Sequence, residues 1–190
     1  MTWEAGLRGW NARYAKEGEF WLGKPPRKLL RDWARLLPER GLALDAASGV
    51  GANGLFLAKR GLSVIALDFS EVALCLAAER ARRKSLPFQS AVYDMALLQL
   101  PAHTFDVIIN FFFLERPALA VYRRALKPGG VLVFETLLKN DAVTVRPEHY
   151  LELGELLPHF ADFDIMHSAE AVGCGENRLS EQLIARKPLG

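Results

Sequence analysis

Apolar positions from about residue 42 onwards follow two alternating periods, which predicts strands and helices in turn. Short apolar or β-branched runs predict strands at 42–44, 63–67, 88–92, 105–112 and 131–136. Between them, helical patterns are expected at 55–59, from an N-cap at Ser70 to the residues before Pro87, and at 119–126. Strands separated by helices are typical of a doubly wound α/β fold with a parallel sheet.

The pattern changes in the last third of the chain. We expect a turn at Pro128-Gly129-Gly130, a helix over 148–159, and strands at 163–168 and 179–186 joined through Gly173-Cys174-Gly175-Glu176-Asn177. Two neighbouring strands with this connection predict an antiparallel pair that closes one edge of the sheet. A dinucleotide-binding domain usually ends with a further parallel unit instead.

Composition limits the possible classes of protein without choosing one. The 190 residues are 51% apolar and 24% charged with a net charge of +2, typical of one globular domain. This charge is too small to require a nucleic acid or an anionic membrane. We interpret the basic run Arg80, Arg82, Arg83 and Lys84 as a solvated helix end.

The two cysteines form neither a disulfide framework nor a metal-binding spacing, which fits a reducing cytoplasm. We expect Cys75 to be a small core residue and Cys174 to lie in a loop. No metal site is predicted. The start of the chain lacks a secretory pattern and no apolar run is long enough to span a bilayer, so a soluble protein is expected.

The turn after the first strand carries the clearest chemical signal. Gly49, Gly51 and Gly54 satisfy the dinucleotide pattern G-x-G-x-x-G, but Asp45 precedes them at the end of the strand. Glycines let a ligand approach the backbone at a helix N-terminus. A carboxylate here repels a pyrophosphate and attracts a cation such as S-adenosylmethionine. Both cofactor classes stay open, and the acid favours the second.

Taken together, these motifs resemble those of the class I S-adenosylmethionine-dependent methyltransferases, over residues 41–188. Asp45-Ala46-Ala47-Ser48-Gly49-Val50-Gly51 is similar to that family's D-x-G-x-G-x-G, with Ala47 where glycine is usual and Ser48 where cysteine is common. Further resemblances are Val64 to Ser70, Tyr93-Asp94-Met95 before Leu100-Pro101, and Leu126 to Leu132. The resemblance implies a Rossmann-like seven-stranded sheet of order 3-2-1-4-5-7-6, the last strand antiparallel, with helices on both faces.

It also implies S-adenosyl-L-methionine as the cofactor and a set of cofactor-binding positions. In that reading Asp45 and the glycine turn face the methionine part, Asp68 accepts from the ribose, and Asp94 with Phe69 and Met95 contacts the adenine. The complete implied set is Asp45, Ala47, Ser48, Gly49, Gly51, Asn53, Asp68, Phe69, Ser70, Tyr93, Asp94, Met95, Asn110 and Phe111. Any single strand-end aspartate can equally be a helix cap.

Within the class, the chain resembles the tellurite-resistance and thiopurine methyltransferases, which implies a small-molecule acceptor. The resemblance lies in residues 10–15, 23–26 and 146–157. The prolines of [DN]-P-P-[FYW], typical of enzymes that methylate amino groups of nucleic acid and glutamine, are absent after Asn110. We therefore expect no nucleic-acid partner, no membrane partner, and a monomer or homodimer in the cytoplasm.

All four tryptophans fall in the first 33 residues, which predicts an N-terminal helical lid over 1–40 ahead of a methyltransferase domain at 41–190. Tyr14 and Trp21 are lid candidates, whereas Trp33, in a helical stretch over 29–37, is expected to pack on the sheet. Arg116 could bind an anionic substrate or be a surface charge. His149 could be a base or a cap, and no catalytic residue is assigned.

Two rival readings remain at this point. One is a dinucleotide-binding oxidoreductase module, which would explain Asp68 equally well. The other is a non-catalytic S-adenosylmethionine-binding protein that keeps the fold. Ala47, which replaces the usual glycine of the motif, hints at this alternative.

Overall fold

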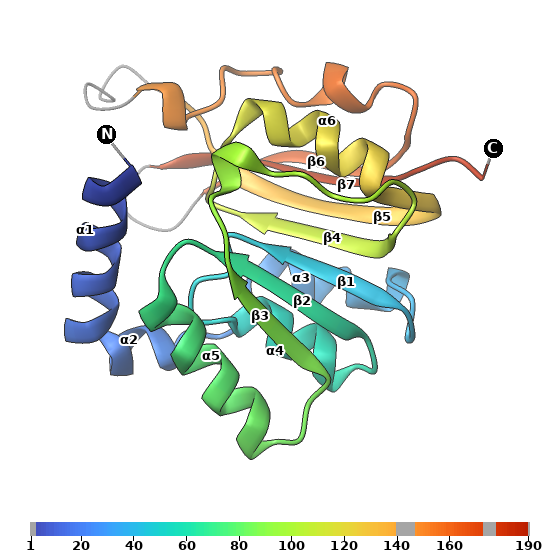
Figure 1. The fold of residues 1–190 in the computed structure, drawn as a ribbon. Coiled ribbons are helices and arrows are strands. Elements are labelled where there is room, and N and C mark those ends of the chain that lie inside the picture. Colours follow the sequence, from blue (N-terminus) through green and yellow to red (C-terminus); the bar gives the residue numbers. More distant parts are fainter. Residues whose placement is uncertain (1–2, 140–146, 173–177, 190) are drawn as a thin grey trace. The chain divides into compact units, whose positions relative to one another are not determined.

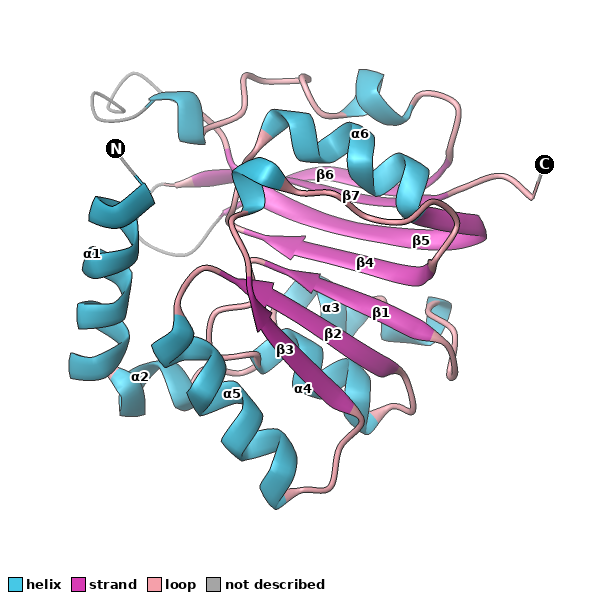
Figure 2. Ribbon diagram, viewed as in Figure 1, coloured by secondary structure: helices cyan, strands magenta, loops and turns pink. Residues whose placement is uncertain are grey.

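The computed structural model describes residues 3–139, 147–172 and 178–189. The chain divides into two compact units, residues 1–98 and 99–190. The described residues form a seven-stranded sheet of order β3-β2-β1-β4-β5-β7-β6 (Figure 2). This order confirms the predicted methyltransferase-like fold class. No helix within the described ranges is long and apolar enough to cross a membrane.

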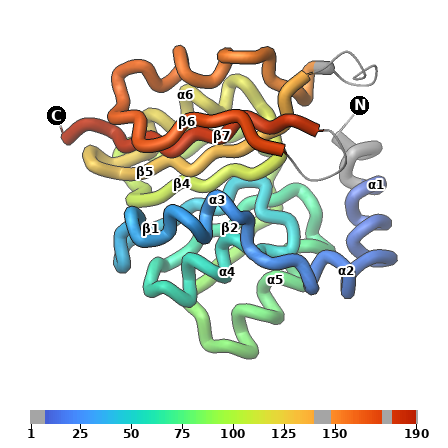
Figure 3. The backbone as a smooth tube through the Cα atoms, turned by 180° about the vertical axis from the view of Figure 1, so that it is seen from behind, coloured from blue at the N-terminus to red at the C-terminus, as the bar shows by residue number. Residues whose placement is uncertain are grey.

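Parallel strands form the sheet of the first unit, as the alternating pattern predicts. They are β1 (Leu42–Ala46), β2 (Ser63–Asp68) and β3 (Phe88–Val92). β1 is followed by α4 (Ala52–Lys59) and β2 by α5 (Glu71–Arg83), and α5 begins at the predicted cap. The Ser70 hydroxyl accepts a hydrogen bond from the Ala73 N–H at 3.2 Å. Helix α4 lies behind β1 and β2 in Figure 1 and in front of them in the opposite view of Figure 3.

Short helical elements precede β1 in the same unit. They are α1 (Trp3–Lys16), α2 (Gly18–Leu22), α3 (Lys28–Asp32) and the 3-10 turn η1 (Ala34–Leu36). Helix α1 packs against α5 and α2. The single helix expected over 29–37 is wrong in detail, because the chain changes from α to 3-10 geometry around Trp33. Trp33 is half-buried.

The second unit contains the rest of the sheet. Its elements are β4 (Phe105–Phe111), α6 (Arg116–Ala125), β5 (Leu126–Leu137), β6 (Asp164–Val172) and β7 (Leu179–Arg186). Strands β4 and β5 are parallel, and β7 is antiparallel to both β5 and β6, which confirms the predicted edge pair. The expected turn at Pro128–Gly130 lies inside β5, where the register with β4 shifts. Gly129 takes a φ of 76° there.

Besides the helix over 29–37, two further local predictions are wrong. The segment expected as one helix over 148–159 forms two 3-10 turns, η3 (Pro147–His149) and η4 (Leu157–Phe160), with a bridge from Leu151 to Leu138 between them. Gly154 has a φ of 77°, which interrupts any helix, and Pro158 would remove a hydrogen bond from a helix interior. The predicted connection at 173–177, with Cys174, lies outside the described residues.

Cys75 is the second correction, since its side chain is exposed rather than in the core. The buried side of α5 is formed by Ala73, Leu74, Ala77 and Ala81. Cys75 follows Leu74 by one position, and successive residues on a helix point in directions about 100° apart. It therefore lies beyond the edge of the apolar stripe.

Candidate functional site

The chain leaves β1 through a turn with unusual backbone angles. Gly49 and Gly51 have φ values of 53° and 72°, and Ala47 has a φ of 53° although it carries a Cβ. A left-handed conformation costs a non-glycine residue roughly 1–2 kcal/mol. Strain of this kind persists where the surrounding structure imposes it, often at a ligand site. The methyltransferases that this motif resembles usually have glycine at this position, and Ala47 has a backbone conformation that glycine adopts without strain.

Two buried carboxylates lie against this turn. Asp45, in β1, is 2% exposed, and its Oδ2 accepts a hydrogen bond from the Gly54 N–H at 2.8 Å. Asp68, the last residue of β2, is 4% exposed and accepts from the Gly49 N–H at 2.8 Å and from the Ser70 N–H at 2.9 Å. Because a carboxylate offers about four acceptor positions, Asp68 keeps capacity for a ligand's hydroxyls.

Burial makes both carboxylates reluctant to ionise. The pKa of Asp45 is raised to about 7, mainly by desolvation; the Gly54 N–H lowers it and the nearby charge of Asp68 adds to the rise. Burial also raises the pKa of Asp68, against the lowering effect of the N–H groups of Ser70, Gly49 and Phe69. A cationic ligand beside the turn would relieve this cost by favouring the ionised forms.

One polar atom in the turn has no partner within the described residues. The hydroxyl of Ser48 is buried and neither donates nor accepts a hydrogen bond there. An orphaned buried hydroxyl is costly unless a ligand or water satisfies it. The Ser48 hydroxyl could bind the methionine end of S-adenosylmethionine, which carries a carboxylate and an ammonium group. Asn53 differs, because its Oδ1 accepts from the Arg27 N–H at 2.9 Å.

The chain beyond β3 reaches the same region of the first unit. The Tyr93 N–H donates to the backbone carbonyl of Asp68 at 2.9 Å, which brings the two strand ends together. Asp94 Oδ1 accepts from the Ala96 N–H at 3.0 Å and caps a 3-10 turn, and Met95 is buried. The predicted residues from β1, β2 and β3 therefore gather at the carboxyl ends of three parallel strands.

Helix α1 covers the glycine turn. Tyr14 is 8% exposed, and a Cβ placed on Gly49 would lie 2.8 Å from its hydroxyl oxygen. Asn11, one turn earlier on the same face, accepts a hydrogen bond from the Ser70 hydroxyl at 2.5 Å. Sequence reasoning missed Asn11 as a site residue. Its i, i+3 spacing to Tyr14 is the signal that could have identified it.

Aromatic side chains surround Tyr14 in this cover. Trp10 stacks on Tyr14 at a centroid distance of 5.5 Å, and Trp21 packs edge-on against it at 5.6 Å. The guanidinium of Arg13 lies 5.1 Å from the Trp10 ring and 4.9 Å from the Trp21 ring. The rings of Trp10 and Trp21 therefore already contact a cation of the chain itself, the guanidinium of Arg13.

The second unit has its own unusual strand end. Asn110, 1% exposed, donates from Nδ2 to the Tyr122 hydroxyl at 3.0 Å, while its buried Oδ1 has no partner within the described residues. Phe111 is buried, and Phe112 has a φ of 58°, a rare conformation for a bulky residue. An orphaned acceptor beside a strained aromatic residue marks this end of β4 as a further candidate ligand position.

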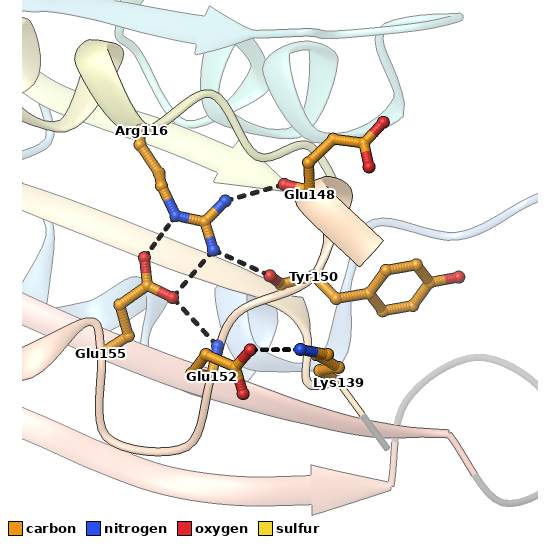
Figure 4. Close-up of polar contacts among 6 residues, drawn as sticks. All are labelled: Arg116, Lys139, Glu148, Tyr150, Glu152 and Glu155. Atoms are coloured by element: carbon orange, nitrogen blue, oxygen red, sulfur yellow. Dashed lines mark hydrogen bonds and ion pairs between the residues drawn. The ribbon is translucent and has the colours of Figure 1, made fainter. Parts of the chain in front are cut away.

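Arg116 forms a network of polar contacts within the second unit (Figure 4). Its guanidinium binds both carboxylate oxygens of Glu155, at 2.5 and 2.9 Å, and donates to the carbonyls of Glu148 and Tyr150 at 2.8 and 3.0 Å. This pairing lowers the pKa of Glu155. The contacts favour a structural role for Arg116, and its anion-binding role stays a prediction. His149 is exposed, 3.9 Å from the Glu148 carboxylate.

The comparisons with known proteins bear on this arrangement. Residues 43–130 match the family model described as a methyltransferase domain. The chain is 30% identical over 139 residues to Hemagglutinin 1 of Eikenella corrodens, covering 68% of this chain and 46% of that protein. It is 32% identical over 102 residues to the ubiquinone biosynthesis O-methyltransferase of Coxiella burnetii, covering 51% and 44%. The chain thus spans less than half the length of these relatives.

A solved structure extends the likeness to most of the fold. The crystal structure of TehB from Haemophilus influenzae superposes with a TM-score of 0.71 at 21% identity, covering 84% of this chain and 61% of that one. The strand order and the acid-flanked glycine turn agree with the family match, which identifies a methyltransferase domain of the S-adenosylmethionine-dependent kind. Residues 43–130 are a methyltransferase domain by the family match, and the likeness to TehB, at 21% identity, confirms the predicted fold. The dinucleotide reading of the glycine turn is thereby set aside.

Proposed function

We propose that this protein transfers a methyl group from S-adenosylmethionine to a small-molecule acceptor. The observation that carries the proposal is the cluster in the first unit, where two buried carboxylates and an orphaned hydroxyl surround a strained glycine turn. The cluster offers acceptors for a cationic, hydroxyl-rich ligand. A cytoplasmic location, expected from the cysteine usage, is part of the same proposal.

Each group in the cluster has a proposed partner on the cofactor. Asp45 would compensate the charge of the methionine ammonium, and the Ser48 hydroxyl would bind its carboxylate. Asp68 would accept from the ribose hydroxyls with the acceptor capacity that the backbone N–H groups of Gly49, Phe69 and Ser70 leave free. Met95, with Phe69 and Asp94, would contact the adenine.

The cofactor, when bound, supplies a carbon already activated by its sulfonium group. The chain's own residues would orient that carbon and exclude water, because in-line displacement depends mainly on positioning. Tyr14 already covers the turn, and burial raises its pKa, so it acts as a cover rather than as a base. An acceptor with a soft nucleophile, such as a thiol, needs little help from a general base.

A small acceptor is supported by the aromatic cover over the turn and by the near-neutral charge of the chain. Asn110 lacks the two following prolines of the enzymes that methylate amino groups of nucleic acid and glutamine. Nucleic acid, protein and membrane acceptors are therefore not expected, and a monomer or homodimer suffices.

The cofactor assignment is tested by calorimetry with two ligands. Asp68→Ala should weaken binding of S-adenosylhomocysteine about tenfold or more, since charge-assisted hydrogen bonds contribute roughly 1.5–3 kcal/mol. The wild type should bind the 2′,3′-dideoxy analogue more weakly than the parent, whereas Asp68→Ala should bind both alike. Asp32→Asn, in an exposed ion pair with Lys28, is the matched control. Equal affinity of the wild type for S-adenosylhomocysteine and its 2′,3′-dideoxy analogue would contradict the assignment.

The acceptor class is tested with radiolabelled S-adenosylmethionine. Small thiols, selenite, tellurite, amines and phenols are assayed beside tRNA, DNA and cell-extract protein. The proposal expects label in the small-molecule fraction. Label found in macromolecules alone would overturn the acceptor assignment and leave the cofactor assignment intact.

A further inference from the structure

A pocket in the first unit, apart from the Asp45–Asp68 cluster, is lined by basic side chains. It lies beside α4 and α5, which are in contact, and the segment after α2. Its lining consists of Lys24, Pro26, Ala52, Leu55, Phe56, Lys59, Arg80 and Lys84. Four of these eight residues are cations, and none of the described lining residues is acidic. The pocket shares no residue with the Asp45–Asp68 cluster.

The four basic residues at the end of α5 form two pairs with different contacts. Arg82 and Arg83 each bind the carboxylate of Glu79 at 2.7 Å, as expected of a solvated helix end. Arg80 and Lys84, one helical turn apart and so on one face, line the pocket instead. The Nη1 atom of Arg80 is buried and has no hydrogen-bond partner within the described ranges.

A buried guanidinium nitrogen without an acceptor is costly, and an anion bound beside Arg80 would remove that cost. The basic residues also repel one another: the charge of Lys59 is the largest cause of a lowered pKa at Lys84, followed by burial and by Arg80. Lys24 packs its ammonium 4.0 Å from the centre of the Phe20 ring, which orients one further cation beside the pocket. The helix dipole accounts for cations at a helix end but not for an orphaned buried donor.

We propose that this pocket binds a phosphate group, either free phosphate or the phosphate of a small phosphorylated molecule. Arg80 supplies planar donors that suit phosphate oxygens, and Lys59 and Lys84 supply point charges around it. Leu55 and Phe56 form an apolar wall that would pack against the uncharged part of a larger ligand. Because Ala52 directly follows the glycine turn on α4, an occupied pocket would also stabilise the start of that helix.

The experiment uses the full chain and two probes, inorganic phosphate and pyrophosphate, titrated by calorimetry against sodium chloride of equal ionic strength. Saturable binding at one site is expected for at least one probe. Lys59→Gln, an exposed position, and Arg80→Gln should each weaken it about tenfold or more. Arg83→Gln removes the same charge from the same helix and should leave the affinity unchanged.

Three results would overturn the proposal. The first is the absence of saturable binding by both probes. The second is an equal loss in Arg83→Gln and Lys59→Gln, which would indicate general charge screening. The third, measured with an oligonucleotide as an additional probe, is an affinity for it that exceeds both phosphate affinities and falls in Lys59→Gln, which would assign the pocket to nucleic acid. A retained affinity for S-adenosylhomocysteine in Lys59→Gln separates this site from the proposed cofactor site.

Discussion

The raised pKa of Asp45 predicts an unusual dependence of stability on pH. Asp45 ionises near its ordinary value of 3.8 in the unfolded chain but at about 7 in the folded protein. Between these values the folded state binds more protons than the unfolded state, so this residue's contribution to stability falls as pH rises. A difference of about three pKa units corresponds to a loss on the order of 4 kcal/mol by neutral pH.

Asp45→Asn isolates this effect. The amide oxygen keeps an acceptor for the Gly54 N–H but cannot ionise, so the variant should gain stability over the wild type as pH rises from about 4 to about 8. Glu155 and Asp162, whose pKa values are lowered, act in the opposite direction, but they are common to both proteins and cancel in the difference.

The measurement is urea unfolding of both proteins at a series of pH values. The free-energy difference between them should change by several kcal/mol across that range, with most of the change below about pH 7. A difference that stays constant to within about 0.5 kcal/mol would show that Asp45 ionises normally in the folded protein, and would refute the reasoning.

Three further predictions concern single contacts. Ala47→Gly should raise the free energy of unfolding by up to about 1 kcal/mol in urea titrations, because it relieves a φ of 53°. Gly49→Ala should lower the melting temperature, because the new Cβ would lie 2.8 Å from the Tyr14 hydroxyl oxygen. Adding Tyr14→Phe should restore part of the loss. If Tyr14→Phe restores nothing, backbone strain alone is responsible. Glu155→Gln should cost about 1 kcal/mol after allowance for solvent screening at the partly exposed Arg116, and an unchanged urea midpoint would contradict this ion pair.

Local patterns predicted the strands and the acids that end them. The apolar run at 105–112 and the acid at Asp68 each follow from residues within one element, so the sequence alone locates them. The glycine turn was predictable for the same reason, because its conformation is set by neighbouring residues.

Contacts between distant segments could not be predicted in this way. Arg116 and Glu155 are separated by 39 positions, and only the folded chain brings their side chains together. The packing of Tyr14 on Gly49 likewise depends on where α1 lies. Across 148–159 the apolar spacing suits a helix, but the left-handed backbone at Gly154 overrides it.

The aromatic cover over the glycine turn gives the protein an intrinsic optical reporter. Indole emission responds to nearby charges and to solvent, and the rings of Trp10 and Trp21 both contact the Arg13 guanidinium and the Tyr14 ring. A ligand that displaces Tyr14 from Gly49 must disturb both indoles. Fluorescence of the unlabelled protein should therefore follow the opening of this cover in real time, and Trp10→Phe and Trp21→Phe would show which ring carries the signal.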